Sequence, residues 1–430
     1  MEMKYICKIF LLVCLLIVLS SFASCSEVEK LSDAGRLPSL LSMDETSDAT
    51  VGIINPYAEV RGVWIATVGN LNFPSKKGLS QKELAAELDE IVEKCGELGL
   101  NAIFFQVRPA ADALYKSELF PASEYVSGNQ GVMPDGNFDC LRYLTDTAHR
   151  AGISVHAWVN PLRVTYGSAR YPKTDISVLS EDHIARKNTD WVIPYADGKL
   201  YFDAGNPSVR DYVAEGVREI AENYDVDGIV FDDYFYPYPV SGAEFDDSLS
   251  FSLYGGGDVD TWRRGNIDQL VKMCHDAIKE VRSNCLFGIS PFGIWKNDDG
   301  LNGGSKTAGL EAYYALYCDA LGFAQKGYVD YLAPQLYWSF ETESAPYGEL
   351  CDWWASALSE SGTRLYISHA AYKYEEWDDP DGELTAQIEY ARKKDIYRGS
   401  LLYGFSSIIG NASGICDEIS SLFEKEIIYW

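Results

Sequence analysis

The stretch that decides the fold is VDGIVFDDYFYPY, residues 226–238. Its apolar run, residues 229–231, leads directly into two adjacent acids and then into a series of rings, which are Asp232, Asp233, Tyr234, Phe235, Tyr236 and Tyr238. Such a short apolar run is typical of a buried strand, so we predict a strand that ends in a polar, aromatic mouth. Because side chains alternate along a strand, the two acids face opposite sides unless the strand ends or twists between them.

The acid pair beside tyrosines favours sugar chemistry. Carboxyl groups move protons or attack the anomeric carbon in glycoside hydrolysis, and aromatic rings pack against sugar faces. The structural alternative for the pair alone is that one Asp caps the next turn while the other is solvated. The acid pair alone does not distinguish the two interpretations, so the sequence on either side of this stretch is needed to choose between them.

Outward from this stretch, strand-like and helix-like segments alternate along the chain. Besides the opening stretch, strands are expected at 60–68, 101–107, 154–160, 286–291, 329–338, 364–371 and 399–405. Helices are expected at 80–97, 138–151, 207–224, 262–282, 310–326, 349–360, 383–394 and 412–425, and a hairpin-like turn at Asp197 and Gly198. This rhythm predicts an α/β protein, a (β/α)₈ TIM barrel with long loops on its catalytic face. A doubly wound sheet shares the rhythm, but no Gly-rich dinucleotide loop follows the first strand.

The first 25 residues differ from the rest of the chain. Lys4 and Lys8 precede an apolar run at 9–19, which is too short to span a membrane comfortably. Phe22-Ala23-Ser24-Cys25 resembles a bacterial lipobox, in which the cysteine is lipidated, and an ordinary signal peptide cut nearby is the alternative. We therefore expect a lipoprotein signal at 1–25, a tether at 26–58 and a barrel domain at 59–430, held on the extracytoplasmic side of a bacterial membrane.

The net charge and the cysteine content exclude several kinds of partner and site. The formal net charge of −28 argues against nucleic acid and against anionic lipid surfaces, because both would be repelled. The cysteines beyond the signal are odd in number and form no CxxC pair, so they are expected to be buried core residues and not disulfides or zinc ligands. They are Cys95, Cys140, Cys274, Cys285, Cys318, Cys351 and Cys416.

In a TIM barrel the chemistry lies at the carboxyl ends of the strands. The expected ends carry amides, acids and rings together, a mixture that suits a glycan cleft. Each residue also has a structural alternative: His156 as a core histidine, Trp158, Trp295 and Trp338 as packing residues, and Arg108 as a partner of Asp112. The side chains in question are Gln106, Arg108, Asp112, His156, Trp158, Asn160, Arg163, Asp232, Asp233, Ser290, Trp295, Gln335, Tyr337, Trp338, His369 and Tyr403.

No metal or other cofactor is expected. His156 and His369 with Asp232 or Asp233 could in principle hold one divalent ion, as a polysaccharide deacetylase needs. No HxH or HxxxH pair supports such a site.

Six motifs carry a family resemblance. They are EVRGVWIATV from Glu59, FFQVRPAADALY from Phe104, VHAWVNPLRV from Val155, DGIVFDDYFYPYP from Asp227, FGISPFGIWKN from Phe287 and PQLYWSF from Pro334. Together they resemble the glycosyl hydrolase-like 10 family of bacterial envelope proteins, in order from about residue 59 to 410. The resemblance implies a TIM-barrel glycoside hydrolase, often a lipoprotein, with peptidoglycan glycan strands as the leading substrate.

The resemblance also implies site residues. Asp232 and Asp233 match the family's most acidic motif and are expected to be catalytic, Asp232 as nucleophile or base and Asp233 as its partner. Asp112, Asp298, Glu341 and Glu343 compete for the general acid, and retention and inversion both stay open. The residues expected to bind substrate are Gln106, Arg108, Asp112, His156, Asn160, Tyr234, Tyr236, Tyr337 and Trp338.

Three functions remain possible at this point. The first is a glycoside hydrolase acting on a cell-envelope polysaccharide by carboxylate acid/base catalysis. The second is a glycan-binding surface lipoprotein without catalysis, and the third is a metal-dependent deacetylase. The acid pair and the expected location in the cell envelope favour the hydrolase. The acidic surface favours, as substrate, glycan strands without the carboxylates of their peptides.

Overall fold

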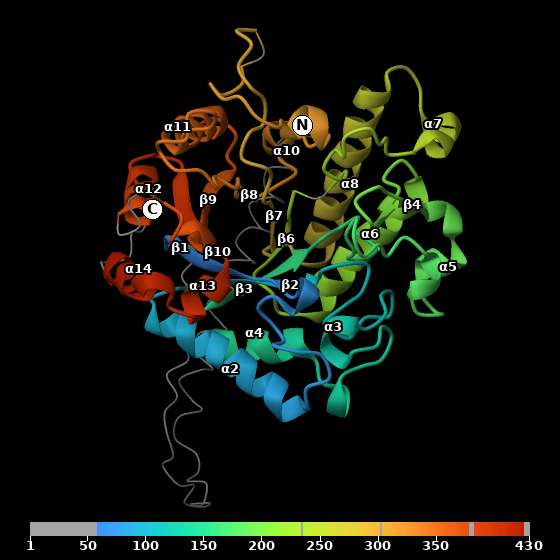
Figure 1. Ribbon diagram of the computed structural model, residues 1–430, viewed down its shortest axis with the longest axis horizontal. Coiled ribbons are helices and arrows are strands. Elements are labelled where there is room, and N and C mark those ends of the chain that lie inside the picture. Colours follow the sequence, from blue (N-terminus) through green and yellow to red (C-terminus); the bar gives the residue numbers. More distant parts are fainter. Residues whose placement is uncertain (1–57, 234, 302, 378–381, 425–430) are drawn as a thin grey trace, which may run out of the picture. The chain divides into compact units, whose positions relative to one another are not determined.

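Eight parallel strands close into a barrel with helices around it (Figure 1). The computed structural model describes residues 58–233, 235–301, 303–377 and 382–424. Around the barrel the strand order is β1-β10-β9-β8-β7-β6-β3-β2. Their bounds are β1 Val60–Ile65, β2 Ala102–Arg108, β3 Ser154–Val159, β6 Gly228–Phe231, β7 Leu286–Ile289, β8 Tyr331–Leu332, β9 Arg364–Ala370 and β10 Tyr397–Tyr403. The predicted (β/α)₈ barrel is confirmed.

Helices follow the strands in turn and form the outer layer (Figure 1). The helices that follow the strands are α2 Gln81–Glu97, α4 Cys140–Arg150, α6 Pro207–Asn223, α8 Val259–Val281, α10 Ala320–Gln325, α11 Tyr347–Leu358, α12 Glu383–Ala391 and α14 Ile415–Phe423. Helix α2 begins with the predicted capping box, in which the Ser80 hydroxyl accepts from the Glu83 N–H and the Glu83 carboxylate accepts from the Ser80 N–H.

The loops at the carboxyl ends of the strands carry the shorter elements. Strands β4 Val192–Pro194 and β5 Leu200–Phe202 pair antiparallel around the turn predicted at Asp197 and Gly198. The short helices are α3 Glu124–Ser127, α5 Ile184–Lys187, α7 Ser248–Tyr254, α9 Ala312–Ala315 and α13 Phe405–Ile409. Strands β4 and β5 and helices α3, α5 and α7 lie after β2, β3 and β6, where long catalytic-face loops were expected.

Three predicted elements are shorter than expected. The helix at 310–326 is broken into α9 and α10, because Tyr317 has a φ of 54° and Asp319 caps the start of α10. The last helix, expected from residue 412, begins only at Ile415, because Ser413 and Gly414 have φ values of 49° and 84°. The strand at 329–338 is reduced to β8, because Pro334 has no N–H to pair, although Gln335 still forms isolated bridges with β-residues on both sides.

The barrel interior is filled with large side chains opposite glycines. A Cβ on Gly288 of β7 would lie 2.1 Å from the Tyr331 ring, and one on Gly228 of β6 would lie 2.4 Å from His156 Nδ1. Phe104 stacks on His156 in the same layer, with ring centroids 4.5 Å apart. The interior at these positions is therefore a packed core.

All seven cysteines beyond the signal are free and buried, as predicted from their apolar neighbours. No described helix is long and apolar enough to cross a bilayer. The predicted signal at 1–25, with Cys25, and the predicted tether at 26–58 lie outside the described residues, except for residue 58.

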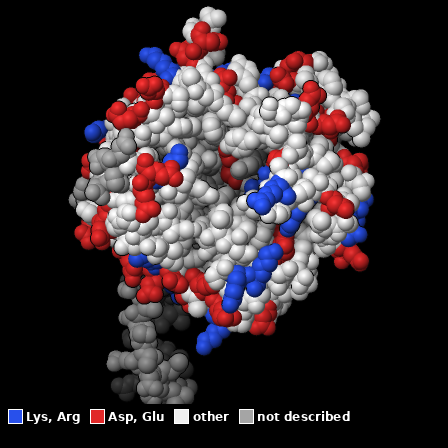
Figure 2. Space-filling model, viewed as in Figure 1, with Lys and Arg blue, Asp and Glu red and all other residues white. Residues whose placement is uncertain are grey.

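Charged side chains lie mostly towards the edge of the face seen in Figure 2. Near its centre this face is hollowed, with uncharged atoms on one side of the hollow and both acidic and basic atoms on the other. Acidic residues outnumber basic ones, 64 to 36, so most of the charged surface is acidic.

Candidate active site

A cavity of about 170 Å³ lies at the carboxyl ends of the barrel strands. Its walls come from strand ends around most of the barrel and combine two carboxyl groups with five aromatic rings, a hydroxyl and an amide. They are Trp64, Trp158, Asp232, Asp233, Tyr238, Ser290, Gln335, Tyr337 and Tyr403. The cavity is the place where the sequence pattern predicted a catalytic cleft.

Both acids face this cavity because the strand ends just before them. Strand β6 stops at Phe231, so the alternation that would send Asp232 and Asp233 to opposite sides no longer applies. Both side chains are nearly buried, with 5% of Asp232 and 2% of Asp233 exposed. The two carboxyl groups therefore share one poorly solvated pocket.

Asp232 is surrounded by hydrogen-bond donors. Its Oδ2 accepts from Trp158 Nε1 at 3.1 Å and from Asn160 Nδ2. Donors of this kind stabilise a carboxylate anion. Asp232 is thus placed to act as the charged member of the pair.

Asn160 is itself held by a chain of hydrogen bonds that begins just after β1. The Thr67 and Val68 N–H groups donate to Gln106 Oε1 at 2.8 and 2.9 Å. Gln106 Nε2 then donates to Asn160 Oδ1 at 2.6 Å. This chain fixes the Asn160 amide so that its Nδ2 points at Asp232, and it explains why two buried amides lie beside the acids.

Asp233 has the opposite environment. Burial, and then the negative charge of Asp232, raise the pKa of Asp233 to about 7. The Tyr238 hydroxyl donates to its Oδ2, and the Gln335 side chain also hydrogen-bonds Asp233, but these bonds do not offset the effect of burial. The pair therefore combines a stabilised anion with a carboxyl group that keeps its proton near neutral pH.

The aromatic walls present flat apolar faces to the cavity. Tyr337 and Tyr403 are nearly parallel, at 11°, with centroids 6.0 Å apart. Trp64 and Trp158 meet edge to face at 5.1 Å. Rings in these positions suit the CH-rich faces of a sugar.

Arg108 does not line this cavity. The pairing of β2 with β3 shifts register between Gln106 and Arg108, so Arg108 turns outward. Its guanidinium lies 4.2 Å from the Phe120 ring centroid, and a Cβ on Gly216 of α6 would meet its Nη1 at 2.3 Å. Among the described residues, Arg108 neither lines the cavity nor forms an ion pair with Asp112.

His156 lies below the cavity in the packed interior. It shares a face of β3 with Trp158 and Asn160 but sits deeper, where its Nδ1 is 2.9 Å from the Tyr331 hydroxyl. Burial lowers the pKa of His156 to about 4. The core alternative for this histidine is what the structure shows.

Asp112 and Tyr236 also point elsewhere. Asp112 lines a separate cavity of about 270 Å³ with Glu124 and Gln130, and burial raises its pKa to about 6. Tyr236 packs edge to face on Phe245 and Tyr317, away from the acids.

The remaining expected residues are placed as follows. Trp338 packs on Phe292, with centroids 5.5 Å apart, and is absent from the cavity wall. Tyr234 lies outside the described residues. The competing acids Asp298, Glu341 and Glu343 are exposed and do not line the cavity.

Of the residues expected to bind substrate, the structure brings Gln106, Asn160 and Tyr337 to the acids. Six cavity residues were not among those expected to be catalytic or to bind substrate: Trp64, Trp158, Tyr238, Ser290, Gln335 and Tyr403. Ser290, Gln335 and Tyr403 stand at strand ends, a signal that the sequence already offered. Trp64 lies inside β1, and only the strand's alternation could have indicated that it points inward.

Within the described part of the chain, no group of three or more His, Cys, Asp or Glu side chains is arranged to hold a metal ion. His369, one of the two histidines weighed as ligands, is buried between Gln387 and Ser400, 3.1 and 2.9 Å away.

Comparison with known proteins places this geometry in context. The family model described as glycosyl hydrolase-like 10 matches residues 59–382. Glycosyl hydrolase YngK of Bacillus subtilis is 40% identical over 377 residues, which cover 85% of this chain and 72% of the relative. Glycosyl hydrolase DigH of Escherichia coli K12 is 34% identical over 353 residues, covering 78% and 79%.

Solved structures agree on the barrel. The glycoside hydrolase domain of PgaB (BpsB) from Bordetella bronchiseptica has a TM-score of 0.52 at 12% identity, over 86% of this chain and 100% of that domain. The endo-1,4-β-mannanase of Rhizomucor miehei has a TM-score of 0.50 at 12% identity, over 86% and 95%. At these identities the matches show the fold alone.

Proposed function

Because the chain belongs to the glycosyl hydrolase-like 10 family, we propose that it hydrolyses glycosidic bonds in a polysaccharide of the bacterial cell envelope. The observation that carries the proposal is the contrast between its two adjacent acids. Asp232 accepts hydrogen bonds from Trp158 and Asn160, whereas burial beside it raises the pKa of Asp233. Glycoside hydrolysis requires such a division between an anion and an acid.

In the proposed reaction Asp233 is the general acid. Its proton passes to the glycosidic oxygen as the bond from that oxygen to the anomeric carbon breaks. The Asp232 carboxylate faces the positive charge that develops at the anomeric carbon. It acts either as the nucleophile or as the base that directs water, whose oxygen ends on the anomeric carbon.

The rings hold the sugar while this happens. The parallel pair Tyr337 and Tyr403 and the indoles of Trp64 and Trp158 flank the acids, so a pyranose can pack against either wall. Gln335 donates to the Ser290 carbonyl at 3.2 Å and hydrogen-bonds Asp233, so its amide lies at the cavity wall beside the acids.

The proposed substrate is the glycan strand of peptidoglycan without its peptides. The family resemblance makes peptidoglycan the leading polymer, and the net charge of −28 disfavours strands whose peptides bear carboxylates. Lipidation of Cys25, proposed from the basic, apolar and small residues before it, would hold the enzyme at the membrane on the extracytoplasmic side, close to this polymer.

The test is mass spectrometry of the products released from peptide-free peptidoglycan strands. The wild type is expected to yield shorter saccharides, and Asp232→Asn and Asp233→Asn to lower the rate by at least about 100-fold. The matched control is Asp298→Asn, which removes an exposed acid outside the cavity.

Each other outcome points to a different function. Binding of the strands without any product would favour a glycan-binding protein. Release of acetate that strong chelators stop would favour a metal-dependent deacetylase. Full activity in both Asp variants would remove the acid pair from the mechanism.

A further inference from the structure

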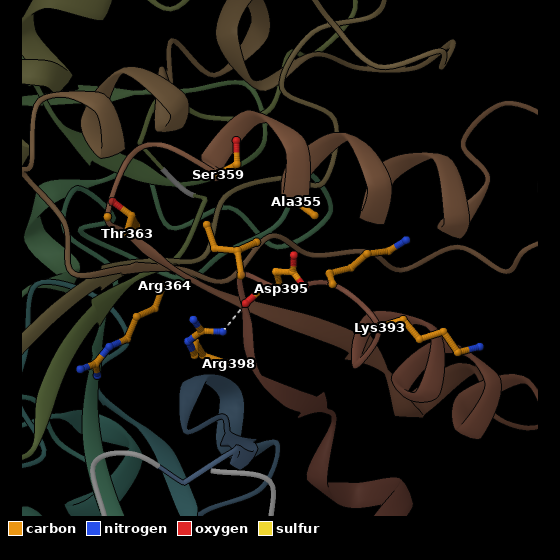
Figure 3. Close-up of a pocket in the computed structure, with 10 residues that line it drawn as sticks. Ala355, Ser359, Thr363, Arg364, Lys393, Asp395 and Arg398 are labelled. Atoms are coloured by element: carbon orange, nitrogen blue, oxygen red, sulfur yellow. Dashed lines mark hydrogen bonds between the residues drawn. The ribbon is translucent and has the colours of Figure 1, made fainter. Parts of the chain in front are cut away.

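Another open cavity, of about 800 Å³, is lined by residues at the amino ends of β9 and β10 (Figure 3). Four basic side chains, Arg364, Lys393, Lys394 and Arg398, line it with one acid, Asp395. This local excess of positive charge contrasts with a chain in which acids outnumber bases 64 to 36. We call these five residues and the cavity they line the basic pocket.

The topology explains why the arginines meet there. Arg364 opens β9 and Arg398 is the second residue of β10, and the two strands pair in parallel with Leu365 beside Tyr397. The side chains of Arg364 and Arg398 therefore extend from the amino ends of neighbouring strands. Because the acids of the catalytic cavity stand at the carboxyl ends, the basic pocket is a separate site.

Two of the basic side chains in the pocket have polar partners within the protein. Lys394 pairs with Asp352 at its edge, and Arg398 donates to the Asp395 and Tyr397 carbonyls at 2.6 and 2.7 Å. The first of these two bonds is drawn in Figure 3. Partial burial, and then the charge of Arg364, lower the pKa of Arg398.

Arg364 and Lys393 differ from Lys394 in their partners. Within the described residues, neither makes a salt bridge to a carboxylate, and Arg364 lies beside the Tyr366 hydroxyl. Arg364 and Arg398 carry like charges that repel each other, which contributes to the lowered pKa of Arg398, and an anion bound between them relieves that repulsion. Guanidinium forks match the oxygens of a phosphate group in particular, which accepts hydrogen bonds from both at once.

We propose that the basic pocket is a binding site for a phosphate group at the amino end of the barrel. The phosphate accepts hydrogen bonds from Arg364 and Arg398, and Lys393 adds charge at the rim. The same end receives the chain before β1, since Val60 pairs with Gly399, the residue after Arg398. Free phosphate and the phosphodiester headgroup of a lipid share this chemistry.

The test is isothermal titration calorimetry of the full chain with inorganic phosphate, beside sodium chloride of equal ionic strength. A parallel titration uses glycerophosphoglycerol, a soluble lipid headgroup. One saturable site is expected with phosphate or with the headgroup, and whichever ligand binds identifies the source. Chloride is expected to give none.

The decisive variant is Arg364→Gln with Arg398→Gln, which is expected to weaken binding about tenfold or more. Arg364→Gln alone is expected to weaken it as well, and it serves if loss of the Arg398 bonds to backbone carbonyls impairs folding. The matched control, Lys76→Gln with Lys82→Gln, removes two exposed charges near the opposite end of the barrel and is expected to bind normally.

The proposal is overturned if neither ligand saturates a site, if the arginine variants bind as well as the wild type, or if the lysine control loses as much affinity. None of these readouts depends on glycosidase activity. Failure of the proposed function would therefore leave this result intact.

Discussion

Asp233 has to hold a proton if it is to act as the general acid. Its pKa is raised to about 7, first by burial and then by Asp232, so the protonated fraction falls as the pH rises through that value. We expect kcat/KM to fall in step, about tenfold for each pH unit above it. A pH profile of product release from about pH 5 to about pH 9 measures this. A rate that stays level or rises across the upper half of that range would assign the acid to another group.

The same pKa makes a prediction for stability. An unfolded Asp titrates near 3.9, so between about pH 4 and about pH 7 the folded state holds a proton that the unfolded state has lost. Stability attributable to this group therefore decreases as the pH rises through that window. Asp233→Asn cannot ionise and is expected to melt at least about 2 °C above the wild type at about pH 8, with little difference at about pH 4. Equal melting curves at both pH values would mean that Asp233 is not destabilised by its ionisation.

Asn160 is a positioning residue, because it acts through Asp232. Asn160→Ala removes a donor to the carboxylate and leaves Gln106 Nε2 without its acceptor. We expect kcat to fall by about 10-fold to 100-fold with a smaller change in KM. The matched control is Asn223→Ala, which changes an exposed side chain at the end of α6. We expect the kinetics of this variant to match those of the wild type. A change confined to KM would instead make Asn160 a simple substrate contact.

At the scale of the elements, the glycines of the barrel strands set how the interior packs. Gly288→Ala places a methyl group 2.1 Å from the Tyr331 ring, which β8 holds against His156. We expect a loss of about 1–3 kcal/mol in the free energy of unfolding, measured by urea denaturation. Gly256→Ala meets no atom within 4 Å and is the control. If both variants unfold alike, the interior is less tightly packed than the strand geometry implies.

The elements also show how far sequence patterns reach. Apolar periodicity and capping residues depend on neighbours in the chain, so the barrel, the Ser80 cap and the convergence of Gln106, Asn160 and Asp232 were all predictable. Arg108 was misplaced because a register shift against β3 changes its direction, and that shift depends on pairing between strands. His156 was misplaced in depth: alternation predicts the face of a strand but not how far along the barrel axis a residue lies.

The directions of side chains in loops were harder to predict than those in strands. Tyr236 follows β6 by a few residues, yet its direction is set by Phe245 and Tyr317, which come from later segments. Tyr238, two residues on, turns back to Asp233. Nothing in the local sequence distinguishes these two tyrosines, because long-range packing decides between them.

For the whole molecule, net charge should control which substrates are accepted. A charge of −28 repels peptide carboxylates over about a Debye length, which is about 30 Å at 0.01 M salt and about 8 Å at 0.15 M. The preference for stripped over peptide-bearing strands is therefore expected to shrink severalfold as salt rises across that range. The measurement is the ratio of initial rates on the two substrates. A ratio that does not change with salt would place the discrimination in contacts within the cavity.

The arrangement of the two acids has a consequence for redesign. A single peptide bond joins them just beyond the last residue of β6. Grafting a loop or shifting a neighbouring strand cannot change the spacing of their backbones, so an engineer can alter their separation only through side-chain partners such as Asn160 and Tyr238. For the same reason, one residue inserted into or deleted from β6 would displace both carboxyl groups together. Such a change would therefore remove both acids from the cavity or neither.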